Sequence, residues 1–148
     1  EYAIPLRLVG SEMCIRDRFV NSLYGPDGQQ NRILEEVYKK FERGHIINIS
    51  STSSYWESGY SPQNYIDNKT LLDGLSKKMS NDSCWGNSEI KVSNIAFGQL
   101  SSQSQKERKD NRNKISLQQA GQFVKWVIDS PTDINIHYMA MDPIQKDQ

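Results

Sequence analysis

Apolar residues recur at helical spacing in three segments of the chain, which predicts three amphipathic helices. The segment 31–43 reads "NRILEEVYKKFER", the segment 65–79 follows a Ser/Gly/Pro-rich loop at 51–64, and the segment 116–129 begins at Ser116, a plausible N-cap. The positions expected on the buried faces of these helices are Ile33, Leu34, Val37, Tyr38 and Phe41, then Leu71, Leu72 and Leu75, then Ala120, Phe123, Val124, Val127 and Ile128.

Three shorter, β-branched runs separate and follow these helices, and we interpret them as strands at 45–50, 89–97 and 134–141. The first, "HIINIS", is nearly all apolar, as in a strand that is buried on both faces of a parallel sheet. Alternating helices and strands predict an α/β fold with a largely parallel sheet and right-handed crossovers. About three strands and three helices make an incomplete doubly wound sheet, so we expect its N-terminal half to be missing before Phe19.

Composition adds limits rather than a function. The 148 residues are 36% hydrophobic and 24% charged with a net charge of zero, which is typical of one soluble domain, expected in the cytoplasm. No apolar run is long enough to span a membrane, and neutral charge gives no reason to bind nucleic acid. The basic stretch 106–114 is expected to be a solvated loop.

The first 18 residues are interpreted as an artefact or a non-native leader, with the origin of residues 1–7 left open. The run "LVGSEMCIRDR" at 8–18 looks like a translation of the adapter DNA used in sequencing libraries, so residues 19–148 are treated as the domain. Cys14 falls in the leader and leaves Cys84 alone, which excludes a disulfide framework and a cysteine-based metal site. His45 and His137 lie in strand-like runs, where packed histidines are commoner than metal ligands.

The candidate chemistry is a tyrosine four residues before a lysine. Tyr65 and Lys69 share one helix face, and the cation is expected to lower the pKa of the phenol from its ordinary value of about 10. Tyr65 then becomes a general acid for a carbonyl oxygen or a general base for an alcohol. Ser51, at the carboxyl end of a strand, can donate to the same oxygen. By itself the spacing is equally consistent with a surface pair that arises by chance.

The surrounding order of motifs resembles the C-terminal half of the short-chain dehydrogenase/reductase family. The chain reads "GHIINISSTSSYW", "YIDNK" and "IKVSNIAFG", where the family has a strand ending in serine, a YxxxK helix and a strand ending in Pro-Gly. The resemblance covers the chain from Phe19 onward and implies a Rossmann-like fold. Because the serine lies one residue further from Tyr65 than is usual in the family, Thr52 is the alternative to Ser51.

The resemblance also implies a role for each matched residue. Tyr65 is the acid/base, Lys69 binds the nicotinamide ribose and lowers the tyrosine pKa, and Ser51 orients the substrate carbonyl. The segment "VNSLYGP" is similar to the start of the helix that carries the active-site asparagine, so Asn21 would hold a water of the proton relay. The segment "FGQLSS" replaces the family's PGxxxT, so Gly98 and Leu100 would border the nicotinamide and Ser102 would take the hydroxyl role of the threonine.

The cofactor implied is NAD or NADP, and the substrate is a small carbonyl or alcohol. Phe97 stands where the family has proline, and the family's glycine-rich TGxxxGxG turn and NNAG segment are absent. The 148-residue chain is therefore expected to bind a dinucleotide weakly and to be inactive by itself. Helices 31–43 and 65–79 commonly pair between subunits in the family, which implies a homodimer or homotetramer.

Three other interpretations remain open. The chain could belong to the extended relatives that act on nucleotide sugars, although few residues follow Lys69. It could be a non-catalytic nucleotide-binding or interaction domain on the same scaffold, since fold does not fix function. It could also be a sequence-assembly product without a function of its own.

Overall fold

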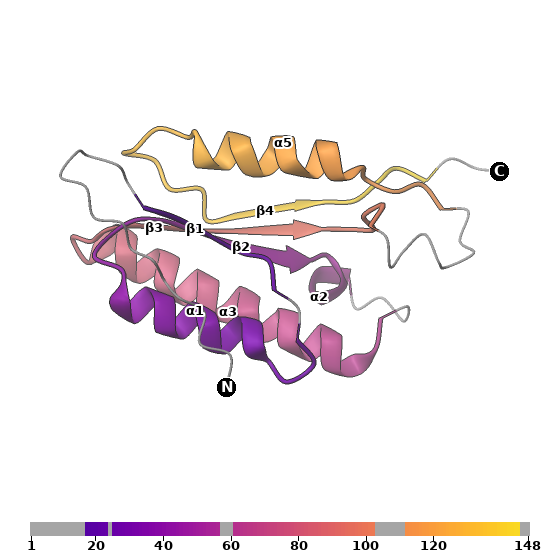
Figure 1. The fold of residues 1–148 in the computed structure, drawn as a ribbon, viewed down its shortest axis with the longest axis horizontal. Coiled ribbons are helices and arrows are strands. Elements are labelled where there is room, and N and C mark those ends of the chain that lie inside the picture. The colour runs from indigo at the N-terminus through magenta and orange to yellow at the C-terminus, as the bar shows by residue number, and fades with distance from the viewer. Residues whose placement is uncertain (1–16, 24, 57–60, 103–111, 146–148) are drawn as a thin grey trace.

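Four parallel strands form one sheet with helices on both faces. The computed structural model describes residues 17–23, 25–56, 61–102 and 112–145. The strands are β1 (Arg18–Asn21), β2 (Arg43–Ser51), β3 (Glu89–Phe97) and β4 (Tyr138–Met141), and they lie side by side in chain order (Figure 1). This arrangement confirms a partial Rossmann-like α/β fold, with four strands rather than about three. Of the leader expected at 1–18, only Asp17 and Arg18 are among the described residues.

β1 is a strand where we expected the start of a helix. Its residues pair in parallel with β2, so that Phe19 lies opposite Ile46 and Asn21 opposite Asn48. The edge of β2 would otherwise present unpaired backbone N–H and C=O groups, and β1 satisfies them. A turn containing Gly25 and Gly28 follows, and the helix begins at Gln29, two residues before the start expected at Asn31.

Two long helices cover one face of the sheet, and a third covers the other (Figure 1). α1 (Gln29–Lys40) and α3 (Gln63–Trp85) lie on one side, and α5 (Leu117–Ile128) lies on the opposite side. The short helix α2 (Ser53–Trp56) lies within the expected loop at the carboxyl end of β2. Each crossover connects a strand to its next neighbour in the same direction across the sheet. Because α5 lies on the face opposite α1 and α3, the crossover through α5 has the opposite hand to the other two. The expectation of right-handed crossovers therefore does not hold for all three connections.

Each face of the sheet has its own hydrophobic core. The core beneath α1 and α3 joins Leu34, Val37, Ile46, Leu72 and Val92. The core beneath α5 joins Ile47, Ile95, Phe97, Ile115, Ala120 and Val127. Neighbouring residues of β2 therefore alternate between the two cores, which is why this strand is apolar along nearly its whole length.

The buried face of α3 is largely built from small polar residues. Ser76, Ser80 and Ser83 are almost fully buried on it, whereas Leu71, expected on the apolar side, is 54% exposed. The serine hydroxyls explain the difference, because each finds a hydrogen-bond partner: Asn48 Nδ2 donates to Ser76 Oγ, and Ser80 Oγ donates to the Val92 carbonyl.

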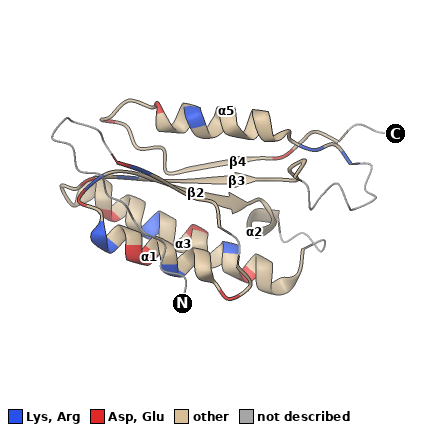
Figure 2. Cartoon of the chain, in the orientation of Figure 1, with Lys and Arg blue, Asp and Glu red and all other residues tan. Residues whose placement is uncertain are grey.

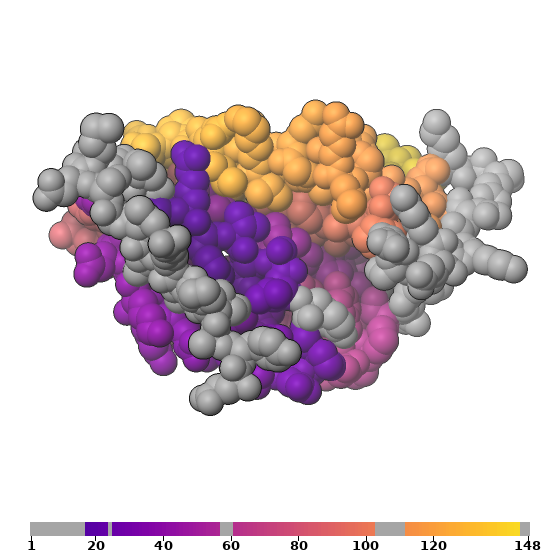
Figure 3. All heavy atoms as spheres, viewed as in Figure 1, coloured from indigo at the N-terminus to yellow at the C-terminus, as the bar shows by residue number. Residues whose placement is uncertain are grey.

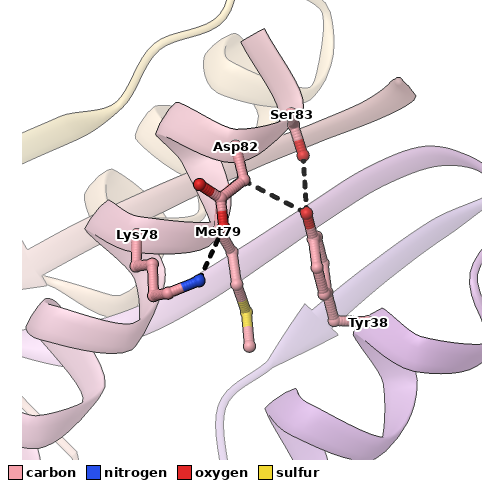
Figure 4. A network of polar contacts seen from close by, with 5 residues as sticks. All are labelled: Tyr38, Lys78, Met79, Asp82 and Ser83. Carbon is pink, nitrogen blue, oxygen red and sulfur yellow. Dashed lines mark hydrogen bonds and ion pairs between the residues drawn. The ribbon is translucent and has the colours of Figure 1, made fainter. Parts of the chain in front are cut away.

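α1 and α3 are also joined through Tyr38. Its hydroxyl lies 3.2 Å from Ser83 Oγ and donates weakly to the Met79 carbonyl, beside the Lys78–Asp82 ion pair on α3 (Figure 4). These contacts join the C-terminal halves of the two helices.

The helices differ in the surfaces they expose. Charged residues are spread along α1 and α3, while α5 carries Lys125 as its one charged residue (Figure 2). Phe123 of α5, expected in the core, is 42% exposed, and Trp126 is also exposed. The indigo residues of β1 and the segment after it also reach the surface beside α5 (Figure 3). Within the described part of the chain, no helix is both long and apolar enough to cross a bilayer.

Candidate active site

A cleft of about 880 Å³ lies at the carboxyl ends of the strands, the edge where open parallel sheets bind ligands. Its volume falls in the range of about 300–1,000 Å³ that is usual for small-molecule sites. The cleft brings together most residues that the sequence singled out: Ser51, Thr52, Tyr65, Lys69, Gly98, Leu100 and Ser102.

Lys69 reaches the cleft from the first half of α3, and its side chain is only 6% exposed. Its Nζ donates to Gln30 Oε1 at 2.8 Å and to the Ile49 carbonyl at 3.0 Å. Burial lowers the pKa of Lys69 from its ordinary value to about 8, while Asp73, one turn further along α3, acts in the opposite direction. Lys69 therefore keeps a positive charge at neutral pH in a site that disfavours it.

Tyr65 lies one turn before Lys69 and lines the same cleft. The Lys69 ammonium sits over its ring, 5.6 Å from the ring centroid. The start of α3 positions this tyrosine: Pro62 is the N-cap residue, and its carbonyl accepts from the Tyr65 N–H at 3.0 Å. This contact is a cation–π interaction, in which the ammonium is attracted to the negative face of the ring.

The two candidate hydroxyls at the end of β2 have different partners. Ser51 Oγ donates to Ser53 Oγ at 3.1 Å, and Ser53 Oγ lies 2.9 Å from Ser61 Oγ near the start of α3. Thr52 Oγ1 instead donates to Asp142 Oδ1 at 2.6 Å. The Thr52 hydroxyl proton is thus held by a carboxylate, whereas Ser51 belongs to a chain of hydroxyl groups along the cleft.

Asn21 does not line the cleft. It ends β1 rather than beginning a helix, and it is 1% exposed. Its Nδ2 donates to the Gln30 carbonyl at 3.1 Å and to Asn48 Oδ1 at 3.0 Å. The asparagine is therefore a buried link between the first two strands and the start of α1.

Gln30 is a site residue that the sequence reasoning missed. It lies on the same helix face as Leu34 and Val37, at positions i, i+4 and i+7, and all three are buried. A polar residue that continues an apolar stripe was the available signal, because a buried amide requires hydrogen-bond partners. One of those partners is Lys69.

Asp142 is a second residue that was missed. It directly follows β4 and lines the cleft, where its Oδ2 accepts from Trp56 Nε1 at 2.7 Å. Its Oδ1 lies against Gly98, and a Cβ on that glycine would come within 2.2 Å of it. Asp142 directly follows the strand expected at 134–141, as Ser51 follows the strand expected at 45–50, so a polar residue just after a predicted strand was the available signal.

The segment after β3 is held beside the cleft by backbone contacts. Gly98 N donates to the Met141 carbonyl at 2.8 Å, and Leu100 forms a parallel bridge with Ile115. Phe97, where the resembled family has proline, packs into the core beneath α5. Its carbonyl accepts from the Thr52 N–H at 3.1 Å.

The histidines take part in hydrogen bonds inside the fold. His45 Nε2 lies 2.8 Å from Ser93 Oγ, and burial lowers the pKa of His45 to about 4. His137 Nδ1 lies 2.5 Å from Ser80 Oγ. Among the described residues, no group of three His, Cys, Asp or Glu side chains is arranged to hold a metal ion.

The cleft offers hydrogen-bond donors at the strand ends, the Lys69 ammonium and the Ser51 hydroxyl, and its volume is sufficient for a small ligand. The sequence contains no glycine-rich G-x-G-x-x-G turn, the motif that brings backbone N–H groups to a pyrophosphate.

No protein-family model matches the chain, and no curated protein matches it in sequence. Solved structures do match the fold. Acetoin dehydrogenase from Enterobacter cloacae is 18% identical with a TM-score of 0.59, over 85% of this chain and 62% of that one. Serine dehydrogenase from Escherichia coli is 20% identical with a TM-score of 0.60, over 90% of this chain and 66% of that one.

A third structure is described as a short chain dehydrogenase/reductase family protein. It is 14% identical with a TM-score of 0.64, over 85% of this chain and 65% of that one. The present chain thus spans slightly less than two thirds of the length of these proteins. At such low identity the likeness shows the fold alone: a partial Rossmann-like sheet of the kind found in these dehydrogenases.

Proposed function

We propose that this chain carries the proton-transfer part of an NAD(P)-dependent oxidoreductase that interconverts a carbonyl and an alcohol, of short-chain dehydrogenase/reductase type. The observation that carries the proposal is the placement of Lys69 Nζ 5.6 Å from the Tyr65 ring centroid, on a cleft at the strand ends that Ser51 also lines. The YxxxK spacing alone did not distinguish a site from a surface pair. The burial of Lys69 beneath the tyrosine supports the site.

In the direction of reduction, Tyr65 donates its hydroxyl proton to the carbonyl oxygen while a hydride adds to the carbonyl carbon. The products are the alcohol and a phenolate, which the neighbouring Lys69 ammonium stabilises. NAD(P)H, when bound, supplies the hydride. In the direction of oxidation, the phenolate takes the alcohol proton.

We assign to the Ser51 hydroxyl the role of hydrogen-bond donor to the substrate oxygen. Its hydrogen bond to Ser53 Oγ is long at 3.1 Å and is made to another hydroxyl, so a substrate oxygen can replace it. Thr52 has the shorter bond, 2.6 Å, to the Asp142 carboxylate. Charge-assisted hydrogen bonds are the stronger ones, so Thr52 is the poorer donor to a ligand.

The nicotinamide end of the cofactor would lie along Lys69, Gly98, Leu100 and Ser102, all of which line the cleft. We propose a small or polar carbonyl or alcohol as substrate and the cytoplasm as location. Because the chain spans slightly less than two thirds of the similar dehydrogenases, cofactor affinity is proposed for the intact protein, and the 148-residue chain alone is expected to be inactive.

Tyr65→Phe tests the proposal. In the intact protein, the loss of the phenolic proton is expected to lower kcat for carbonyl reduction by about 10²–10⁴-fold, the usual contribution of a general acid. The measurement is NAD(P)H absorbance with a panel of small carbonyl compounds. Tyr55→Phe, an exposed tyrosine outside the cleft lining, is the matched control. Undiminished turnover in Tyr65→Phe would remove the assignment.

A second candidate is a non-catalytic nucleotide-binding domain on the same scaffold. Its support is Asp142, a carboxylate that lies against Gly98 within the same cleft and has no role in the proposed hydride transfer. NADH that quenches the fluorescence of Trp56 in the cleft, without hydride transfer to any carbonyl compound, would favour this candidate.

A further inference from the structure

The side chain of Gln30 joins three elements beneath the cleft. Its Nε2 donates to the Asn21 carbonyl of β1 at 2.8 Å and to the Ile49 carbonyl of β2 at 2.9 Å. Its Oε1 accepts from Lys69 Nζ of α3 at 2.8 Å. The residue itself belongs to the first turn of α1 and is buried.

These partners permit one orientation of the amide. Both Nε2 hydrogens point at carbonyl oxygens, so the oxygen must face the ammonium. The reversed amide would place its hydrogens against the Lys69 hydrogens and its oxygen against two carbonyl oxygens, which is unfavourable at every contact. The orientation of Gln30 is therefore determined by the backbone on one side and by Lys69 on the other.

The start of α1 brings Gln30 to this place. Gly28 is the N-cap residue with φ of 68°, in the left-handed region that glycine adopts without strain. Asn21 Nδ2 donates to the Gln30 carbonyl at 3.1 Å. The first turn of the helix is thus tied to the end of β1 through both the side chain and the backbone of Gln30.

Several charged and titratable groups surround Lys69, whereas its acceptor Gln30 Oε1 carries no charge. On α3 Lys69 is flanked by Tyr65 and Asp73, and the Ile49 carbonyl of β2 accepts a hydrogen bond from it. The oxygens of Asp73 already accept three hydrogen bonds, from Ser50 Oγ, Ser54 Oγ and Asn94 Nδ2. Asp142 and Arg112 also line the cleft.

We propose that Gln30 is the positioning residue of this site: it holds the Lys69 ammonium beneath Tyr65 by a neutral acceptor, so that the charge of Lys69 acts on the tyrosine rather than on a carboxylate. The catalytic consequence rests on the proposed function, but the effect of Gln30 on Lys69 does not. A carboxylate at position 30 would form an ion pair with the ammonium, and an apolar side chain would leave it with one acceptor fewer.

Two substitutions at Gln30 are therefore expected to shift the pKa of Lys69 in opposite directions. Gln30→Glu stabilises the ammonium and is expected to raise the pKa of Lys69 by about one unit or more, as is typical of an opposite charge within hydrogen-bonding distance. Gln30→Met removes the acceptor at similar length and is expected to lower the pKa. A role confined to packing would not produce opposite signs.

The experiment measures the titration of Lys69 by NMR on the 148-residue chain labelled with ¹³C at lysine Cε, with the signal assigned by Lys69→Arg. Gln29→Glu is the matched control, because it adds the same charge one residue away on the exposed side of α1. It is expected to leave the titration unchanged. Gln30→Asn, which keeps the amide but shortens its reach, is a second removal of the acceptor should Gln30→Met not fold.

The proposal is overturned if folded Gln30 variants titrate at Lys69 like the parent chain, or if Gln29→Glu shifts Lys69 as far as Gln30→Glu does. In the intact protein, the pH dependence of kcat is expected to move in the same direction as the pKa of Lys69. If the pKa of Lys69 shifts as expected while Tyr65→Phe retains full turnover, the positioning role of Gln30 stands and the proposed function fails. The two proposals can therefore be distinguished.

Discussion

Lys69 combines two properties that ordinarily exclude each other, since it is charged near neutral pH and almost fully buried. Its hydrogen bonds to Gln30 and to the Ile49 carbonyl compensate part of the lost hydration. The uncompensated part of the lost hydration lowers the pKa of Lys69 to about 8. A residue of this kind reduces stability and is usually kept for a functional reason.

This residue predicts a pH dependence of folding. Between about pH 8 and 10.5, the unfolded chain keeps the Lys69 proton that the folded chain has released. The unfolded state then binds more protons, so the free energy of unfolding rises with pH in this window. Relative to Lys69→Met, the parent chain is expected to gain up to about 3 kcal/mol across it, at about 1.4 kcal/mol per pKa unit.

Urea denaturation of both chains at pH 7.5 and at pH 10.5 gives the measurement. All other residues are the same in the two chains, so the comparison isolates the contribution of Lys69. Stability curves that stay parallel over this range would mean that the folded state does not lower the pKa of Lys69.

At the scale of an element, the start of α5 is predicted correctly by local sequence signals. Ser116 was expected as an N-cap, and the structure confirms it with a full capping box: Ser116 Oγ accepts from Gln119 N, and the Gln119 side chain accepts from Ser116 N. Both contacts lie within four residues, so they depend little on the rest of the fold.

Removal of this cap is expected to have a modest and local cost. Ser116→Ala deletes the acceptor of one backbone N–H and is expected to lower the free energy of unfolding by about 1 kcal/mol. Gln118→Ala, an exposed position in the same turn, is the control and is expected to change it by no more than about 0.5 kcal/mol. Chemical denaturation measures both, and equal effects would contradict a capping role.

The buried face of α3 shows where such signals fail. Hydrophobic periodicity selected Leu71, Leu72 and Leu75, but Leu71 is exposed and the inner face continues through Ser76 and Ser80. Small hydroxyl residues let the helix lie close to the sheet and find acceptors there. Their burial depends on partners in β2 and β3, which no window along α3 contains.

At the scale of the whole molecule, the exposed side of α3 predicts an interface. Leu71 is 54% exposed and Trp85 is 85% exposed, both on the helix that the family resemblance assigns to subunit pairing. If the intact protein forms the homodimer or homotetramer that the resemblance implies, Leu71→Glu is expected to convert it to a smaller species, because the substitution would bury a charge in the contact.

Light scattering coupled to size-exclusion chromatography measures the change in mass. Gln122→Glu, which adds the same charge to α5 on the opposite face of the sheet, is expected to leave the mass unchanged. A parent protein that is already monomeric would reject the proposed pairing.

The sequence by itself determined the order and type of the main elements, the strand at 89–97 and the helix cap at Ser116, because hydrophobic period and capping chemistry act over a few residues. It also selected Tyr65, Lys69 and Ser51 as neighbours, since the carboxyl ends of parallel strands share one edge.

The tertiary structure alone decided that the segment at 18–21 pairs as a strand, that Asn21 lies outside the cleft, and that Gln30 and Asp142 face Lys69 and Thr52. Gln30 meets a lysine 39 residues away, and Asp142 meets a threonine 90 residues away. Contacts of this kind follow from the stacking order of strands and from which face each helix covers, and neither is set by the pattern of any single segment.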